Sequence, residues 1–218
     1  MKILLISGDH PRHLNFVDNL SLTGFEIFWF IEKRENMIPK VPSNISSNLK
    51  RLFKLHFDKR LEAENRFFNI NTGLIARKNI NYIKEYVEIE KITNTIKKKI
   101  NEVKPEILIS FGCSIIPDKI LKIPKFKKIN IHLGLSPWYK GAATHFWPSY
   151  FLEPEYTGIT VHDLSNQVDS GPIIYQEAVN LNFNDGIHEN ACRVTKEFNK
   201  KFPMIMKKNI KILLKKKG

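Results

Sequence analysis

Cysteine is scarce in this chain, and the two cysteines stand far apart. Cys113 and Cys192 are the only ones among 218 residues, and they form no CxxC pair. The sequence therefore shows neither a disulfide framework nor a cysteine-based zinc motif. This usage is typical of proteins in a reducing compartment, so we expect a cytoplasmic location and no metal site.

Long apolar runs are also missing. The first one, residues 3–6, is too short for the core of a signal peptide, and Asp9 follows soon after it. No uninterrupted apolar segment approaches the length that is needed to cross a bilayer. We therefore expect a cytoplasmic protein with no membrane partner.

Acidic residues are few compared with basic ones. The chain has 35 Lys and Arg against 22 Asp and Glu, a formal net charge of +13, and no acid follows Glu197. The lysines after that point are Lys200, Lys201, Lys207, Lys208, Lys211, Lys215, Lys216 and Lys217. Such a run is typical of a solvated helix end, so nucleic acid is not the expected partner. A basic nucleic-acid-binding protein on a degenerate enzyme fold stays open as an alternative.

The apolar pattern predicts one domain, residues 1–218, in which strands and helices alternate. We predict strands at residues 2–7, 25–31, 107–111, around 130, 156–163 and 172–179. We predict helices at residues 14–22, 49–68, 80–103, 117–121, 142–152 and 187–202. Asp185 would cap the last helix and Pro203 would end it. This order favours a doubly wound, mostly parallel α/β sheet, in which residues 172–179 could pair with 156–163 as a hairpin.

Polar side chains stand at the end of one predicted strand. Asn130 and His132 alternate with Ile129 and Ile131, so a strand would place both polar groups on one face. Glycine, serine and proline follow at once and end the strand. Ligand sites in open α/β sheets lie at this carboxyl edge. The first strand, by contrast, is not followed by G-x-G-x-x-G, so a dinucleotide site is not supported.

Five short motifs, in order and spacing, resemble the formyltransferase family. They lie at residues 107–117, at 130–132, at 136–141, at 161–162 and at 168–174 (Val-Asp-Ser-Gly-Pro-Ile-Ile). The best-known members of this family act on glycinamide ribonucleotide and on methionyl-tRNA. The resemblance implies a doubly wound α/β fold and 10-formyltetrahydrofolate as the formyl donor. It covers residues 105–177 well and the first strand loosely, and residues 32–80 show no usable match.

The resemblance also implies a catalytic set, namely Asn130, His132 and Asp169. Asn130 would donate hydrogen bonds to the formyl oxygen as the attacking amine gives it negative charge. His132 would hold the same oxygen when protonated, or pass on the proton of the amine. Asp169 would orient His132, favour its protonated form, or fix a water. His162 matches the family as well, but its neighbours alternate as in an ordinary strand, so we expect a structural role for it.

Two loops correspond to those that line the folate pocket in relatives. The residues expected to contact folate are Cys113, Ser114, Ile115, Gln167, Val168 and Asp169. The residues expected to contact the acceptor are Gly8, Arg12, Tyr139 and Lys140. Contacts of the folate loops are made largely by backbone, so the side chains there neither support nor oppose this assignment.

Departures from the family pattern bear on the acceptor. Residues 134–137 read Gly-Leu-Ser-Pro where Ser-Leu-Leu-Pro is familiar, which resembles the branch that formylates nucleotide-linked amino sugars. Asp9 follows Gly8 where relatives bind a phosphate, so glycinamide ribonucleotide is not expected. The methionyl-tRNA relative carries a second domain that this sequence does not show. We therefore expect a small primary amine; a formyltetrahydrofolate hydrolase and a homodimer stay open.

Overall fold

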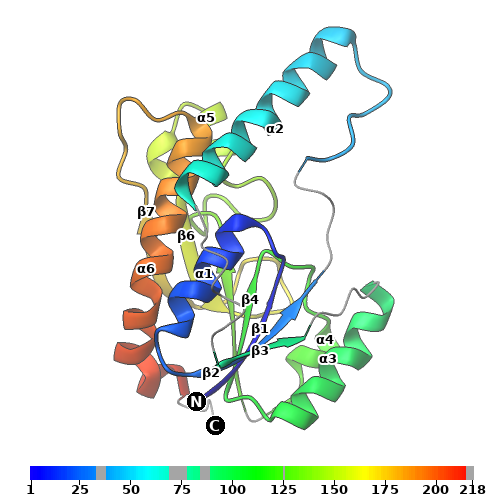
Figure 1. The fold of residues 1–218 in the computed structure, drawn as a ribbon, viewed down its shortest axis with the longest axis vertical. Coiled ribbons are helices and arrows are strands. Elements are labelled where there is room, and N and C mark those ends of the chain that lie inside the picture. Colours follow the sequence, from blue (N-terminus) through cyan, green and yellow to red (C-terminus); the bar gives the residue numbers. More distant parts are fainter. Residues whose placement is uncertain (33–37, 69–77, 84–88, 125, 215–218) are drawn as a thin grey trace.

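The computed structural model describes residues 1–32, 38–68, 78–83, 89–124 and 126–214 (Figure 1). The strands are β1 (Lys2–Ser7), β2 (Glu26–Ile31), β3 (Ile80–Ile83), β4 (Ile107–Phe111), β5 (Lys127–His132), β6 (Gly158–Asp163) and β7 (Ile173–Ala178). The helices are α1 (Pro11–Ser21), α2 (Ser47–Phe67), α3 (Ile89–Val103), α4 (Asp118–Leu121), α5 (Trp147–Tyr150) and α6 (Ile187–Leu214), with a 3-10 turn at Pro154–Tyr156.

These strands form one sheet in the order β3-β2-β1-β4-β5-β6-β7. The first five are parallel, and β6 and β7 run antiparallel at one edge. β1 and β4 are apolar and buried over almost their whole length, as strands covered on both faces must be. The prediction of a doubly wound, mostly parallel sheet is confirmed, and so is the hairpin of the last two strands.

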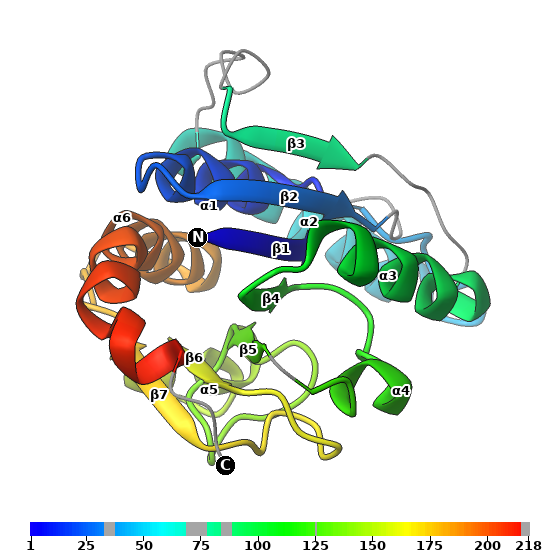
Figure 2. The ribbon, with the colours of Figure 1, turned by 90° about the horizontal axis from the view of Figure 1, so that it is seen from below.

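Helices cover both faces of the sheet (Figure 2). On one face α1 and α6 pack on Ile3 and Leu5, and on the other α3 and α4 pack on Leu4 and Ile6. Successive residues of β1 thus enter opposite cores, as the alternation of a strand requires. The sheet changes direction of winding between β1 and β4, which is where open α/β sheets leave a crevice for ligands.

Residues 80–103 do not form the single helix that the isoleucine spacing predicts. Ile80–Ile83 is the edge strand β3, paired with β2, and α3 begins only at Ile89. The side chain of Asn79 donates to the carbonyls of Ser21 and Phe25 and thereby fixes the start of β3. These pairings with β2 are long-range contacts, and the local apolar spacing could not reveal them.

Residues 142–152 contain much less helix than predicted. Only Trp147–Tyr150 is α-helical, because Ala143 has a φ of 56° and the Thr144 hydroxyl bonds to the carbonyl of Leu133. An α-helix excludes such a positive φ. The segment before α5 is therefore held as an irregular loop over the end of β5.

The last helix passes through the proline that was predicted to end it. α6 runs from Ile187 to Leu214 with Pro203 inside it. Proline removes one helical hydrogen bond, but Phe202 and Met206 are both buried in the core and keep the helix in place across it. Asp185 does not adjoin the helix; its carboxylate accepts a hydrogen bond from Arg193 Nε at 2.6 Å.

Candidate active site

Three polar side chains lie in one row across the ends of β4, β5 and β6. Ser110 is the register partner of Asn130, and Asn130 is the register partner of His162. Ser110 Oγ donates to Asn130 Oδ1 at 2.7 Å, and Asn130 Nδ2 lies 3.2 Å from His162 Nε2. Ser110 was not predicted, although a serine within the apolar run of β4 is the signal that could have found it. His162 contacts Asn130 inside this cluster, and the structural role expected for it stays a prediction.

The orientation of the Asn130 amide follows from its neighbours. Ser110 donates to its oxygen, so its nitrogen must face His162 and Asp169, whose Oδ1 is 3.1 Å away. His162 Nδ1 donates to the carbonyl of Asp163 at 2.8 Å, which leaves Nε2 of the neutral ring as an acceptor. Both amide hydrogens of Asn130 therefore have acceptors inside the cluster.

His132 is buried beside this row, with 5% of its surface exposed. Its Nε2 lies 2.8 Å from the carbonyl of Tyr139, and because a carbonyl only accepts, Nε2 carries a proton. Its Nδ1 lies 3.2 Å from Asp169 Oδ2. Burial lowers the pKa of His132, and the Tyr139 carbonyl and Asp169 offset this only in part. The resting ring is thus neutral, with the Nδ1 lone pair facing Asp169.

Asp169 joins the two histidines and the asparagine. Its Oδ1 contacts Asn130 and His162, and its Oδ2 contacts His132 and accepts from the Gly141 N–H at 2.9 Å. Burial raises the pKa of Asp169, but its contacts with His162, His132 and the Gly141 N–H outweigh burial and leave the pKa below its usual value. Asp169 is therefore ionised at neutral pH, and it has a φ of 46°, which aspartate tolerates better than most residues.

The cluster opens into a cavity of about 570 Å³ at the carboxyl ends of β4 and β5. All residues predicted to contact folate line this cavity: Cys113, Ser114, Ile115, Gln167, Val168 and Asp169. Asn130, His132 and His162 line it as well. The structure therefore brings together the two predicted loops and the predicted catalytic residues, while the identity of the ligand stays a prediction.

Glu32 is a buried acid that no sequence pattern singled out. It follows β2 and is 3% exposed, and its Oε2 accepts from the Ser114 N–H at 2.7 Å. The Cys113–Ser114 loop forms one wall of the cavity, so Glu32 fixes that wall. Its position after an apolar strand was the available signal, but its partner lies 82 residues away.

A second cavity, of about 290 Å³, lies between α2, α6 and the loop after β5. It shares Leu133 and Ala143 with the first cavity, so the two are neighbours. Arg12 Nη2 and Arg60 Nε both pair with Glu64 Oε1 at its edge, the Arg60 pair at 3.3 Å. Two guanidinium groups thus share one carboxylate, which leaves the cavity an excess positive charge.

The residues predicted to contact the acceptor lie in different places. Arg12 lines the second cavity, whereas Gly8, Tyr139 and Lys140 line neither cavity. Tyr139 contributes its carbonyl to His132, and its hydroxyl donates to Glu153 at 2.5 Å. Lys140 Nζ donates to Ser170 Oγ at 3.0 Å, next to Asp169. An acceptor contact of these residues stays a prediction.

Metal ligation and membrane spanning both lack support in the described part of the chain. Within it, no group of three or more His, Cys, Asp or Glu side chains is arranged to hold a metal ion. The helices described there include none that is long and apolar enough to cross a membrane.

Comparison with known proteins agrees with the geometry. Residues 58–206 match the family model described as formyl transferase. Methionyl-tRNA formyltransferase of Thermodesulfovibrio yellowstonii is 38% identical over 90 residues, which is 40% of this chain and 29% of that protein. The bifunctional polymyxin resistance protein ArnA of Wigglesworthia glossinidia brevipalpis is 32% identical over 116 residues, 51% of this chain and 18% of that protein. The chain thus spans less than a third of these relatives.

Solved structures share the fold over nearly the whole chain. Phosphoribosylglycinamide formyltransferase from Bacillus halodurans superposes with a TM-score of 0.64 at 15% identity, covering 96% of this chain and 95% of that one. A sugar N-formyltransferase from Shewanella sp. FDAARGOS_354 gives 0.54 at 19% identity, covering 96% and 71%. The family match extends over more than half of the sequence, and with the site geometry it shows that this chain belongs to the formyl transferase family.

Proposed function

We propose that this protein transfers the formyl group of 10-formyltetrahydrofolate to the primary amine of a nucleotide-linked amino sugar in the cytoplasm. One observation carries the proposal. The cluster of Asn130, His132 and Asp169 lies in one cavity, and a second, positively charged cavity adjoins it at Leu133 and Ala143. A two-substrate transfer needs two such sites that meet at the reacting groups.

The first cavity suits the formyl donor, which supplies an activated one-carbon group. Its volume of about 570 Å³ is within the range of pockets that bury small ligands. Ile115 and Val168 line it and are 79% and 52% exposed. Exposed apolar side chains on the two loops would cover the flat faces of an aromatic ring, and the backbone of the same loops supplies hydrogen-bonding groups.

His132 is placed to move the proton. Its neutral ring holds one proton on Nε2, towards Tyr139, and has its lone pair on Nδ1. An attacking amine gives up a proton as its bond to the formyl carbon forms, and Nδ1 can take that proton. The resulting imidazolium donates to Asp169 Oδ2, whose negative charge stabilises it. The proton then returns to the nitrogen that loses the formyl group.

Asn130 is placed to stabilise the formyl oxygen as it gains negative charge. Both of its amide hydrogens are directed at His162 and Asp169, so one acceptor has to be replaced. A charged oxygen is a stronger acceptor than a neutral imidazole nitrogen, and it can displace His162 from Asn130. Ser110 keeps the amide oriented meanwhile, because it holds the oxygen end.

The second cavity supports an anionic amine as the acceptor. Arg12 and Arg60 contribute two positive charges against the single charge of Glu64. A diphosphate between nucleoside and sugar would contact these guanidinium groups, which also agrees with the basic character of residues 51–66. A hydrolase would need only water at this position, so the presence of a charged second cavity favours the transferase.

The test follows the conversion of 10-formyltetrahydrofolate to tetrahydrofolate by purified protein. The reaction would be run with nucleotide-linked amino sugars, glycinamide ribonucleotide, methionyl-tRNA or no amine. We expect turnover with an amino sugar, lowered about 100-fold or more in His132→Ala and Asp169→Asn. Lys119→Ala serves as the control, because Lys119 is exposed on α4 and lines neither cavity.

Each other result has a definite meaning. Formate release without any amine would identify a hydrolase. Turnover with glycinamide ribonucleotide or methionyl-tRNA alone would overturn the amino sugar as acceptor but keep the reaction. The absence of both turnover and folate binding would overturn the proposed enzymatic activity. Salt-sensitive binding of nucleic acid that persists in His132→Ala would then support a nucleic-acid-binding protein.

A further inference from the structure

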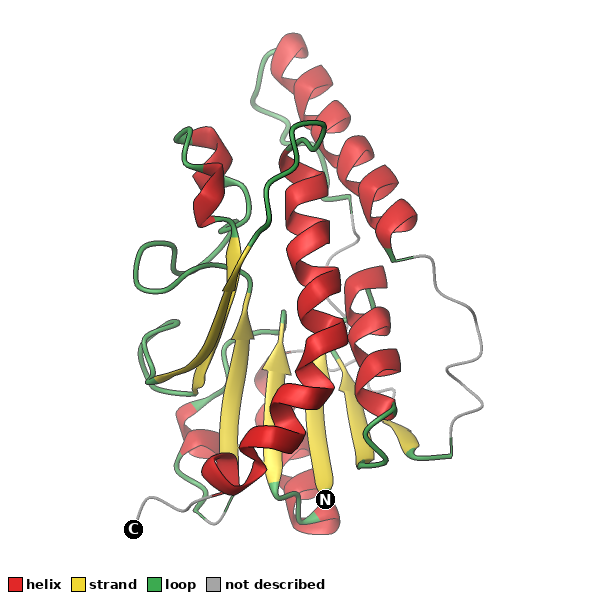
Figure 3. Cartoon of the chain, turned by 90° about the vertical axis from the view of Figure 1, so that its left-hand side faces the viewer, coloured by secondary structure: helices red, strands yellow, loops and turns green. Residues whose placement is uncertain are grey.

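The first half of α2 projects beyond the rest of the protein (Figures 1 and 3). The helix begins at Ser47, where the hydroxyl of Ser46 accepts from the Leu49 N–H at 3.3 Å. From His56 onwards α2 packs on the rest of the protein, because the centroid of the His56 ring lies 5.6 Å from that of Phe146 and 4.5 Å from that of His188. Residues 47–55 therefore form a capped helical end that stands away from the core.

This projecting end carries an exposed apolar face. Leu49, Leu52 and Leu55 are 52%, 51% and 46% exposed. They are spaced three residues apart, so at 100° per residue they follow an arc of roughly 120° on one side of the helix. Three large apolar side chains on one solvated helix face are costly in water, and they mark a surface that meets an apolar medium.

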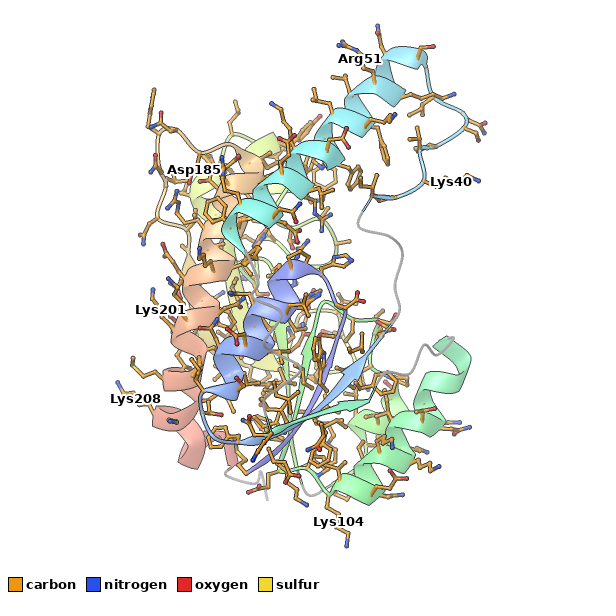
Figure 4. The ribbon with its side chains drawn as sticks, in the orientation of Figure 1. Lys40, Arg51, Lys104, Asp185, Lys201 and Lys208 are labelled. Atoms are coloured by element: carbon orange, nitrogen blue, oxygen red, sulfur yellow. The ribbon has the colours of Figure 1, made fainter. Side chains whose placement is uncertain are left out.

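The opposite face of the same segment is basic. Lys50, Arg51 and Lys54 are all exposed and lie within an arc of roughly 100°. Figure 4 shows Arg51 at the free tip of α2, at the far end of the molecule from Lys104. No acidic residue occurs between Asn44 and Phe57. The projecting segment is thus an amphipathic helix with a strongly cationic polar side.

We infer that residues 47–55 of α2 dock on an anionic lipid surface, lying in its plane with the leucines inserted between the headgroups. Leucine on one face and lysine or arginine on the other is the pattern of helices that lie at membrane interfaces. Each basic residue near an anionic bilayer adds to the attraction, and the net charge of +13 brings the protein to it. The inference does not depend on the proposed function.

Other occupants explain less of this surface. Nucleic acid would account for the lysines but would leave the leucines in water. A second copy packed through the same face would cover the leucines but would leave the basic side without a partner of opposite charge. An anionic bilayer satisfies both faces. The expectation of no membrane partner rested on the absence of a spanning segment, which a helix lying on the surface does not need.

The test measures cosedimentation of the full chain with vesicles of phosphatidylcholine alone or mixed equally with phosphatidylglycerol. We expect partitioning at least about tenfold stronger into the anionic vesicles. The variant Leu49→Ser, Leu52→Ser, Leu55→Ser should reduce it at least about tenfold, and so should Lys50→Glu, Arg51→Glu, Lys54→Glu.

Matched controls alter equal numbers of exposed residues elsewhere. The leucine control changes Leu22, Leu152 and Leu181 to Ser, and the charge control changes Lys104, Lys119 and Lys122 to Glu. Both should bind vesicles as the parent does, and circular dichroism should show that every variant is folded. Absence of vesicle binding would overturn the inference. Vesicle binding that does not depend on the α2 leucines would also overturn it, and so would binding that is lost equally in the charge control. Binding of RNA in place of vesicles, independent of the leucines, would have the same meaning.

Discussion

At the scale of single residues, the chemistry of Asn130 depends on three neighbours from three segments. Ser110 holds its oxygen, while His162 and Asp169 receive its hydrogens. Without the serine, the oxygen end of the amide would lose its hydrogen-bond donor, and the side chain would be held at its nitrogen end alone. In the proposed reaction Ser110 is therefore a positioning residue that acts through Asn130.

We predict that Ser110→Ala lowers kcat about tenfold, since a misoriented amide no longer stabilises the formyl oxygen. The lost buried hydrogen bond should cost about 1 kcal/mol of stability. Steady-state kinetics and urea unfolding would measure both effects. Ser21→Ala removes a similar bond, to the Asp18 carbonyl, far from the cluster. Equal loss of kcat in both variants would contradict a positioning role for Ser110.

Asn130, His132 and Asp169 could be predicted because their motifs are short and local. Ser110 and Glu32 could not be assigned roles from the sequence, because each has its partner on another strand or loop. The contact of His162 with Asn130 could not be predicted for the same reason. Their spacing along the chain contains no information on register. The row across β4, β5 and β6 exists only after the strands have paired.

At the scale of elements, the turn after Val168 places the Asp169 carboxylate. The backbone of Gly171 passes so close to β6 that a Cβ built on it would stand 1.8 Å from the Asp163 carbonyl oxygen. Any side chain at this position would push the turn away from β6. Asp169 would move with the turn and lose its contacts with His132 and Asn130.

Gly171→Ala should therefore lower kcat about 100-fold and destabilise the fold by about 1–3 kcal/mol, as overpacked sites do. Gly24→Ala is a matched control, since Gly24 has a φ of 77° but a Cβ added there would meet nothing within 4 Å. It should cost about 1 kcal/mol of stability and leave kcat unchanged. Normal turnover in Gly171→Ala would show that the turn tolerates displacement.

Helices and strands were predictable where their apolar pattern was long and regular. The buried runs of β1 and β4 and the long face of α6 gave their type correctly. The helix predictions for residues 80–83 and 142–146 were wrong. Pairing with β2 makes the first segment a strand, and the hydrogen bond of Thr144 to the Leu133 carbonyl holds the second as a loop. The prediction that Pro203 ends the last helix was wrong, because the buried side chains of Phe202 and Met206 stabilise the helix by more than the one lost hydrogen bond costs.

At the scale of the whole molecule, neutral histidines around the second cavity couple folding to pH. Burial lowers the pKa of His145 to about 3 and that of His188 to about 4. In the unfolded chain both would titrate near a pKa of about 6.5. The unfolded state therefore binds more protons below that pH, so stability is full above about pH 6.5 and falls as the solution becomes more acidic.

We predict that the free energy of unfolding decreases from about pH 6.5 down to about pH 4, where His188 charges in the folded state, and further towards pH 3 through His145. Each histidine contributes up to about 1.4 kcal/mol per pH unit within its window. Urea unfolding across this range would measure the slope. His188→Gln should flatten it above pH 4, and an unchanged slope in that variant would assign the effect to other groups.

The sequence alone determined the family resemblance, the α/β class and the candidate catalytic residues, because these depend on local motifs and on apolar periodicity. Tertiary structure alone decided that Ser110 and His162 meet Asn130, that Arg12 pairs with Glu64, and that two cavities adjoin at Leu133. It also decided which half of α2 is covered. The physical reason is that burial, register and pKa depend on contacts between distant segments, which exist only in the folded chain.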